Sequence, residues 1–259
     1  MTFFVKHYAR LVRIGNLFII ALTMYMLRWA LVKPMLEFRY SELLETQVTH
    51  QFSDFQFFLL VLSITMIAAA GYIINDYFDR ATDFINRPDK VILGRFITRR
   101  TAIALHWILS ITGVALGFYL AIQINLFAAG NIFFIAAALL WFYSTNLNRM
   151  FLVGNVTIAF LTALIPFLLA LFEIVPLNKE YRNFLISFYL NFNPILHWLL
   201  GYSAFAFLST LIREIVKDMQ DFEGDNQSGR RSLPIELGIQ NTKKIVIGLT
   251  IVMILLLLL

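Results

Sequence analysis

Residues 56–83 read QFFLLVLSITMIAAAGYIINDYFDRATD, a long apolar run that ends in three aspartates. A helix needs about 20 mostly apolar residues to cross a bilayer. This run is too long and too continuously apolar for a strand, so it predicts a membrane-spanning helix over 56–75. Further runs of the same kind lie near 14–32, 101–122, 126–144, 151–172, 195–216 and 245–259. The sequence therefore predicts an all-α polytopic membrane protein with seven visible spans.

The composition of the whole chain supports the same class. Hydrophobic residues make up 59% of the 259 residues and charged residues 14%, whereas soluble domains average about 45–50% and about 25%. The mean hydropathy is +0.74. These values exclude an ordinary soluble domain and a disordered chain. The chain contains no cysteine, which excludes a disulfide framework, a thiolate nucleophile and a cysteine metal site.

The net charge of +5 is distributed unevenly along the chain. With the N-terminus in the cytoplasm, the segments 1–13, 78–100, 145–150 and 213–244 face the cytoplasm and contain 16 of the 21 Lys and Arg residues. The other five, Arg28 among them, fall at the opposite ends of the spans. Cytoplasmic loops carry the excess of Lys and Arg, so we expect a cytoplasmic N-terminus in the cell inner membrane. Basic residues spread over several loops also argue against a nucleic-acid partner.

Two aspartate clusters share the spacing D-x2-D-x3-D at the cytoplasmic ends of two predicted spans. They are Asp76, Asp79 and Asp83 after the second span, and Asp218, Asp221 and Asp225 after the sixth. On a helix, residues i, i+3 and i+7 fall within about 60° of one another. We therefore expect each motif to present three carboxylates on one helix face.

Three neighbouring carboxylates repel one another unless positive charge lies between them. Ligands that are all oxygen suit a hard divalent ion, and Mg²⁺ commonly bridges carboxylates to a substrate phosphate. Acids at helix ends are often merely solvated, but two matched clusters on one side of a membrane are costly and favour a functional role. The paired motifs predict metal ions held against a diphosphate.

Two other classes of membrane protein also place acids on helices. A cation transporter would need ionisable groups deep within the spans, and here the spans are nearly free of them away from their ends. CDP-alcohol phosphotransferases have a motif that begins D-G-x-x-A-R, whereas this chain reads DYFDRATD over 76–83. Both alternatives are weaker than a one-sided diphosphate site.

The two motifs carry a family resemblance. NDYFDRATDFINRPDK over 75–90 resembles the first Asp-rich motif of the UbiA superfamily of intramembrane prenyltransferases, and KDMQDFEGDNQSGRRSLPIELG over 217–238 resembles the second. YSTNLNR over 143–149 is similar to a third element of that family. REIVKDMQDFEGD over 213–225 most resembles the digeranylgeranylglyceryl phosphate synthase branch. One departure is KVILGRFIT after residue 89, where many members have Pro-Leu-x-Ser-Gly.

The resemblance implies a bundle of nine helices around a central cavity, of which seven are visible here. Residues 1–259 would form a single transmembrane prenyltransferase domain, and we expect the natural chain to continue beyond Leu259 because natural chains rarely end in mid-bilayer. The implied activity is Mg²⁺-dependent transfer of a geranylgeranyl group from a prenyl diphosphate to a lipid acceptor, geranylgeranylglyceryl phosphate. The alternative within the superfamily is prenylation of an aromatic acceptor in quinone biosynthesis. Membrane lipid would surround the domain.

The resemblance also implies roles for individual residues. The metal ligands would be Asn75, Asp76, Asp79, Asp83, Asp218, Asp221 and Asp225, with Asp76, Asp79, Asp218 and Asp221 as the catalytic core. The diphosphate would be bound by Arg87, Lys90, Arg149, Lys217, Arg230 and Arg231. The cavity would be lined by Asn16, Tyr72 and Tyr143. Aromatic faces there would stabilise the positive charge that develops on the allylic carbon.

Overall fold

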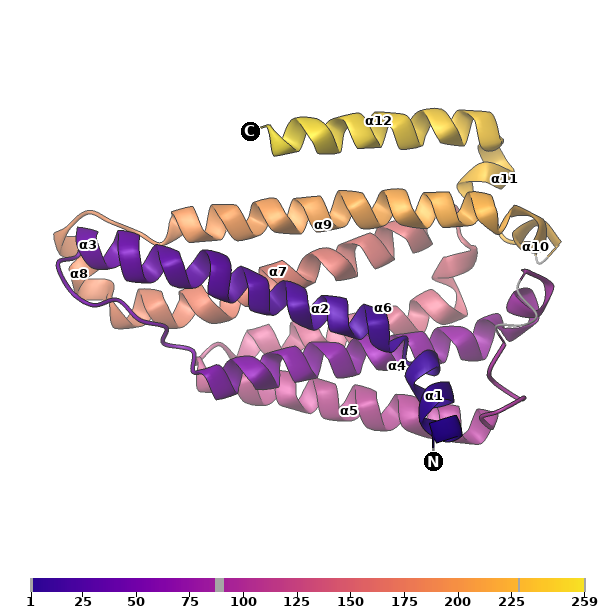
Figure 1. Ribbon diagram of the computed structural model, residues 1–259, viewed down its shortest axis with the longest axis horizontal. Coiled ribbons are helices and arrows are strands. Elements are labelled where there is room, and N and C mark those ends of the chain that lie inside the picture. The colour runs from indigo at the N-terminus through magenta and orange to yellow at the C-terminus, as the bar shows by residue number, and fades with distance from the viewer. Residues whose placement is uncertain (1, 87–90, 228, 259) are drawn as a thin grey trace.

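The computed structural model describes residues 2–86, 91–227 and 229–258, with the backbone alone for 2–4, 81–83, 85 and 86. In these residues the regular structure is helical, apart from an isolated β-bridge between Leu93 and Ile97. The long helices run along the longest axis of an elongated bundle (Figure 1). The prediction of an all-α protein is confirmed.

Seven helical segments in the described part of the chain are long and apolar enough to cross a membrane. They are α2 (Ile14–Met26) continued by η1 (Leu27–Val32), η2 (Met35–Tyr40) and α3 (Ser41–Leu43), then α4 (Asp54–Asn86), α5 (Arg99–Gln123), η4 (Phe127–Ala129) with α6 (Gly130–Thr145), α7 (Val153–Glu180), α9 (Asn193–Gln220) and α12 (Ile239–Leu257). The shorter elements are α1 (Thr2–Leu11), η5 (Leu147–Arg149), α8 (Arg182–Ser187), α10 (Phe222–Gln227) and α11 (Leu233–Leu237). The seven predicted spans are thus confirmed.

The first span is longer than predicted, since helical structure continues to Leu43 rather than ending near residue 32. The added turns keep an apolar face, because Leu36 and Tyr40 are buried. Their exposed face carries Lys33 and Glu37, whose charged atoms lie 3.6 Å apart at i, i+4. An apolar face and a paired charged face together extend the helix beyond the hydrophobic run.

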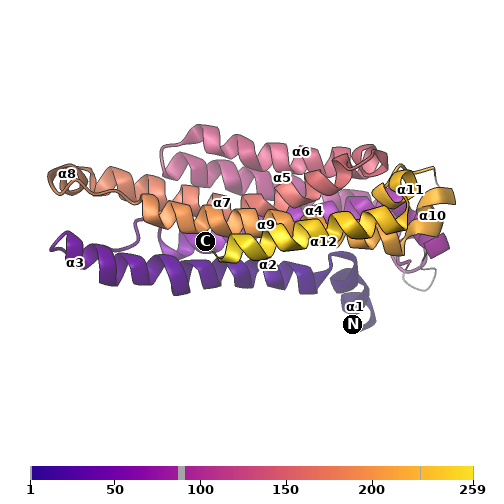
Figure 2. The same ribbon diagram turned by 90° about the horizontal axis from the view of Figure 1, so that it is seen from above.

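The bundle is built around α4, which contacts α2, α5 and α6. On its other side, α7 packs along α9, and α12 lies against α9 at the edge of the bundle (Figures 1 and 2). Burial follows this arrangement: 61% of the apolar window of α4 is buried, against 6% for α12. The helix that bears the first aspartate motif is therefore the most enclosed of the seven.

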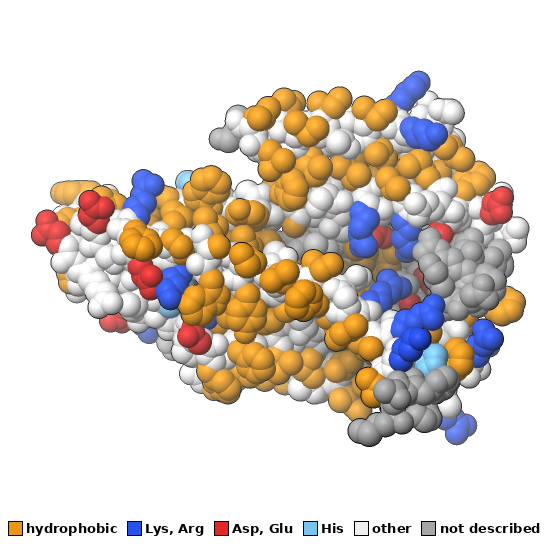
Figure 3. All heavy atoms as spheres, viewed as in Figure 1, with side chains coloured by type: hydrophobic (Ala, Val, Ile, Leu, Met, Phe, Trp, Pro, Cys, Tyr) orange, Lys and Arg blue, Asp and Glu red, His pale blue; other side chains and the backbone are white. Residues whose placement is uncertain are grey.

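The surface separates into an apolar middle and two charged ends. In Figure 3, apolar side chains cover the middle of the visible face, while acidic and basic side chains gather toward its ends. Charged groups avoid the hydrocarbon core because leaving water is costly for them. The distribution therefore fits a protein that crosses a bilayer along its long axis.

Close packing of α5 against α6 depends on glycine. A Cβ added at Gly117 would lie 2.3 Å from the ring of Phe133. We expect Gly117→Ala to lower the free energy of unfolding by about 1–3 kcal/mol, because overpacking forces neighbouring side chains to shift. Thermal unfolding in detergent would measure this. Gly201→Ala on α9 is the matched control, since an added Cβ there meets nothing within 4 Å. Equal melting temperatures for the two variants would contradict the tight α5–α6 contact.

A buried charge cluster lies at the end of the bundle away from the aspartate motifs. Arg28, one of the five Lys and Arg residues expected at that end, is 1% exposed, and its Nε lies 2.9 Å from Oε1 of the fully buried Glu173. The guanidinium also donates to the carbonyl oxygen of Phe52 and lies 4.4 Å from the ring centroid of Phe57. His50 Nδ1 lies 2.9 Å from the second carboxylate oxygen of Glu173. These partners compensate the cost of burying the Arg28 charge.

Candidate functional site

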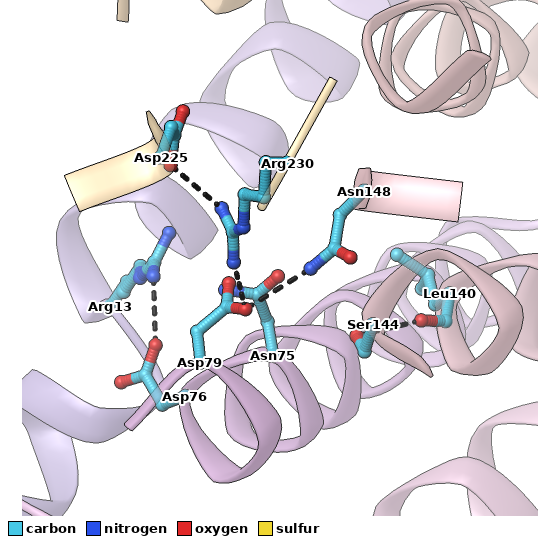
Figure 4. A network of polar contacts seen from close by, with 9 residues as sticks. All are labelled: Arg13, Asn75, Asp76, Asp79, Leu140, Ser144, Asn148, Asp225 and Arg230. Atoms are coloured by element: carbon cyan, nitrogen blue, oxygen red, sulfur yellow. Dashed lines mark hydrogen bonds and ion pairs between the residues drawn. The ribbon is translucent and has the colours of Figure 1, made fainter. Parts of the chain in front are cut away.

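The two aspartate motifs meet at one end of the bundle, where the C-terminal ends of α4 and α9 approach the start of α2 (Figure 1). α10 contacts both α4 and α9 at this point. Figure 4 shows the resulting polar network. Elements far apart in the sequence thus bring their acidic and basic side chains together.

The first motif lies within the continuous helix α4, as predicted. Asp76 Oδ1 accepts a hydrogen bond of 2.8 Å from Arg13 Nη2. Arg13 occupies the turn before α2 with φ 52°, a left-handed conformation that few side chains adopt, and its guanidinium lies 4.8 Å from the ring centroid of Tyr72. Asn75 Nδ2 donates to Asp79 Oδ2 at 3.1 Å. Two neighbouring acids therefore receive different partners.

Arg230 connects the two motifs (Figure 4). Its Nη2 donates to Asp79 Oδ1, and its Nη1 lies 3.4 Å from Asp225 Oδ1. The side chains of Arg230, Asp79 and Asp225 are 14%, 12% and 4% exposed, so this charge bridge is largely shielded from water. Burial raises the pKa of Asp225, and the nearby guanidinium opposes that shift. The guanidinium occupies the position between the motifs where positive charge is required.

The second motif departs from its predicted form. α9 ends at Gln220, and Asp221 has φ −96° and ψ 14°, so the helix is interrupted there. Asp218 lies in the last turn of α9, whereas Asp225 is carried by the separate helix α10. The expectation of three carboxylates on one helix face is therefore wrong for this motif. The interruption instead lets α10 approach α4 and brings Asp225 to Arg230.

Two asparagines that lie outside the motifs donate hydrogen bonds to motif aspartates. Asn148 Nδ2 donates to Asp79 Oδ1 at 3.1 Å, and Asn155 Nδ2 donates to Asp218 Oδ2 at 2.8 Å. Sequence reasoning assigned neither residue to the site. Asn148 stands directly before the predicted Arg149 in the third family element, which was the available signal, whereas Asn155 had none.

The predicted phosphate-binding arginines divide into two groups. The Arg149 side chain is exposed, and its carbonyl oxygen accepts a hydrogen bond of 3.1 Å from the backbone of Arg231. The Arg231 side chain donates to Glu236 at 2.5 Å, and this bond lowers the pKa of Glu236. Of the described arginines in this set, Arg230 is the one seen to contact the motifs. Arg87 and Lys90 lie outside the described residues, as does the side chain of Asp83.

A cavity of about 320 Å³ opens beside the motifs, between α2, α4, α6, α7 and α9. Tyr72, Asn75, Tyr143 and Lys217 form part of its wall near the motifs, and Asn16 donates to the Tyr72 hydroxyl at 3.3 Å. Farther along the same helices the wall is apolar. Its residues there include Ile20, Ile64, Phe133, Ile165 and Leu168. The cavity can hold a molecule with a charged head and a hydrocarbon chain.

Comparison with known proteins identifies the family. The UbiA prenyltransferase family matches residues 46–259. This chain belongs to that family. It is an integral membrane protein with seven apolar helices in its described part.

Three relatives of this UbiA family member are digeranylgeranylglyceryl phosphate synthases of archaea. The one from Methanothermobacter thermautotrophicus is 36% identical over 188 residues, which cover 72% of this chain and 58% of the relative. Those from Pyrococcus abyssi and Sulfolobus acidocaldarius are each 33% identical, over 70% and 75% of this chain and over 56% and 63% of their own lengths. The chain therefore spans less than two thirds of the length of these relatives.

A solved structure shares the fold. It comes from a study of "the biosynthesis of Digeranylgeranylglyceryl phosphate synthase in membranes", and it matches 98% of this chain and 76% of its own with a TM-score of 0.63. The sequence identity is 23%, so the likeness concerns the arrangement of the helices. The predicted UbiA-like bundle is confirmed.

The donor atoms of the site fit the divalent metal ion that members of the family generally use. Asn75 Oδ1 and Asn148 Oδ1 are buried and have no hydrogen-bond partner in the described structure, and each is a carbonyl oxygen able to bind a hard cation. The described acids and histidines nowhere form a group of three able to hold an ion. Arg13 and Arg230 instead neutralise the carboxylates. A metal ion at the site would either bind these acids alongside the arginines or displace the arginines from them.

Proposed function

We propose that residues 1–259 form one prenyltransferase domain that transfers a geranylgeranyl group from geranylgeranyl diphosphate to geranylgeranylglyceryl phosphate, with Mg²⁺ bound at the aspartate motifs. One observation carries the proposal: Arg230 bridges the two motifs beside a cavity whose deeper wall is apolar. The charged head of a prenyl diphosphate matches the motifs, and its hydrocarbon chain matches the cavity. The names of the archaeal relatives support the glycerophosphate acceptor.

The residues around the site would divide the work of binding the diphosphate. The candidate ligands of Mg²⁺ are Asn75, Asp76, Asp79, Asp83, Asp218, Asp221 and Asp225. Bound Mg²⁺ would neutralise the charge that makes diphosphate a poor leaving group. Lys217 and Arg230 would donate hydrogen bonds to diphosphate oxygens, Arg230 with the bidentate geometry of a guanidinium. Arg87, Lys90, Arg149 and Arg231 remain candidates for further contacts.

The cavity wall would protect the reacting carbon. As the bond from the allylic carbon to the diphosphate oxygen weakens, positive charge develops on that carbon. The rings of Tyr72 and Tyr143 line the cavity beside the motifs, where aromatic faces attract a cation and exclude water. The family and the apolar depth of the cavity both support this assignment.

We further propose that the N-terminus and both motifs face the cytoplasm, in the inner membrane of the cell. The support is the excess of Lys and Arg in the segments at that end of the spans. Membrane lipid would cover the apolar middle of the surface (Figure 3).

The test is a transfer assay with protein purified in detergent. We expect radiolabel from geranylgeranyl diphosphate to enter geranylgeranylglyceryl phosphate in the presence of Mg²⁺, and EDTA to abolish the transfer because the diphosphate then keeps its charge. Parallel reactions contain hydroxybenzoate or dihydroxynaphthoate as aromatic acceptors. Transfer to an aromatic acid alone would keep the prenyltransferase activity and overturn the acceptor. Absence of both transfer and Mg²⁺-dependent binding of the diphosphate would overturn the proposal and favour the cation transporter.

A further inference from the structure

Two charged residues of the cavity wall have no part in the functions described so far. Arg213 and Glu214 are consecutive residues of α9, one helical turn before the second motif, and both line the cavity. Arg213 Nη2 donates to Glu214 Oε1 at 2.7 Å. The side chain of Arg213 is 64% exposed, whereas that of Glu214 is 8% exposed.

The geometry of this pair is unusual for neighbours on a helix. Consecutive side chains diverge by about 100° around the helix axis and do not face each other. The bond therefore forms because the Arg213 guanidinium bends over the carboxylate at the cavity wall. A carboxylate buried in a membrane span is costly unless it is paired, and such groups usually serve a function. The Glu214 carboxylate, paired with Arg213, thus lies at the wall that faces whatever enters the cavity.

The position of Glu214 relative to the diphosphate site is defined by the helix. Glu214 and Asp218 are at i and i+4, so they lie on the same face of α9, about 6 Å apart along its axis. Asp218 belongs to the end of the cavity where the diphosphate would bind. Glu214 lies one turn deeper, at the level expected for the first carbon of the prenyl chain.

We infer that Arg213 and Glu214 form the subsite for the acceptor, with Arg213 binding its phosphate and Glu214 accepting the proton of its hydroxyl. This inference rests on the proposed function. In a glycerophosphate the reacting hydroxyl is carried by the carbon beside the phosphate-bearing carbon, so a cation and a carboxylate in direct contact match the two groups. An aromatic acceptor without phosphate would leave the guanidinium unused.

The pair also suggests how binding prepares the reaction. Before the acceptor binds, the guanidinium neutralises Glu214. The acceptor phosphate then takes over the guanidinium as a bidentate partner and leaves the carboxylate as a base for the hydroxyl. In the transfer step the hydroxyl oxygen forms the ether bond to the allylic carbon, and its proton passes to Glu214. The bond from that carbon to the diphosphate oxygen breaks, and diphosphate leaves with the electron pair.

Steady-state kinetics of the purified chain with geranylgeranyl diphosphate and geranylgeranylglyceryl phosphate test the inference. We expect Arg213→Ala to raise the acceptor KM about 10- to 100-fold, the usual value of a hydrogen bond to a charged group, and to leave the donor KM unchanged. Wild type should prefer the phosphorylated acceptor over geranylgeranylglycerol, and Arg213→Ala should lose most of that preference. Arg213→Lys should recover part of it.

Substitutions of Glu214 should change the steady-state constants in a different way from those of Arg213. We expect Glu214→Gln, which conserves shape, to lower kcat about 10²- to 10⁴-fold, the range for loss of a general base, with both KM values near those of wild type. Glu214→Asp should recover part of the rate. Lys243→Ala, an exposed charge on α12, is the matched control and should behave as wild type.

Each contrary result identifies what fails. If wild type transfers the prenyl group and both variants keep wild-type constants, the acceptor subsite is wrong while the proposed function stands. Loss of donor binding in either variant would assign the pair to the diphosphate site and also overturn the inference. If wild type prenylates no glycerophosphate, the proposed acceptor fails and the subsite fails with it. Melting temperatures of all variants near that of wild type ensure that folding is not the cause.

Discussion

Replacing Asp79 by alanine is expected to lower the rate of prenyl transfer by about 10³-fold, equivalent to about 4 kcal/mol of transition-state stabilisation. Asp79 accepts hydrogen bonds from Asn75, Asn148 and Arg230. Its loss would remove a candidate metal ligand and break the bridge by which Arg230 links Asp79 to Asp225 (Figure 4). Single-turnover transfer of labelled prenyl diphosphate would measure the effect.

The substitution Asp79→Asn distinguishes the contribution of the Asp79 charge to activity from its contribution to the fold. Asparagine can still accept hydrogen bonds from its neighbours, so the fold should be kept, whereas the negative charge needed to hold Mg²⁺ is lost. We expect a loss of activity close to that of the alanine variant and a higher Mg²⁺ concentration for half-maximal rate. Glu223→Ala, an exposed acid on α10, is the control. Wild-type activity in Asp79→Asn would contradict the metal-binding role of the first motif.

The fold was predictable from the sequence because hydropathy is a local property. Each apolar run is long enough to require a spanning helix, and the spacing of the first motif correctly gave a continuous helix through Asp76 and Asp79. The same spacing in the second motif wrongly predicted one continuous helix through Asp221, where α9 has ended and α10 has not yet begun. The direction of a chain that leaves a helix depends on tertiary contacts, here the Arg230 bridge to Asp225, and not on residue spacing.

Partners contributed by distant segments could not be predicted. Asn155 lies in α7 and Arg13 in the turn before α2, and their contacts with Asp218 and Asp76 exist because the bundle brings these segments together. Glu214 belongs to the stretch REIVKDMQDFEGD that carries the family resemblance, but its contact with Arg213 could not be predicted from residue spacing. Spacing identifies acids that share a helix, whereas the charges that neutralise them come from elsewhere in the fold.

Replacing Glu173 by alanine is expected to destabilise the protein by about 3–5 kcal/mol, because it leaves the buried charge of Arg28 without its main partner. The two side chains are 0% and 1% exposed, and their charged atoms lie 2.9 Å apart. At about 2–4 °C per kcal/mol for a chain of roughly this size, the melting temperature should fall on the order of 10 °C. Thermal unfolding in detergent measures the change, with Glu180→Ala, an exposed acid at the end of α7, as the control.

The double substitution Arg28→Met with Glu173→Leu distinguishes a structural pair from a functional one. Removing both charges removes the unpaired group together with the desolvation penalty of each ion, so the double variant should unfold near the wild-type temperature or above it, although each single variant is destabilised. Because the pair lies at the opposite end of the bundle from the aspartate motifs, prenyl transfer by the double variant should also be retained. A stable double variant without transfer activity would instead show that Arg28 and Glu173 take part in function, as charged groups within membrane spans commonly do.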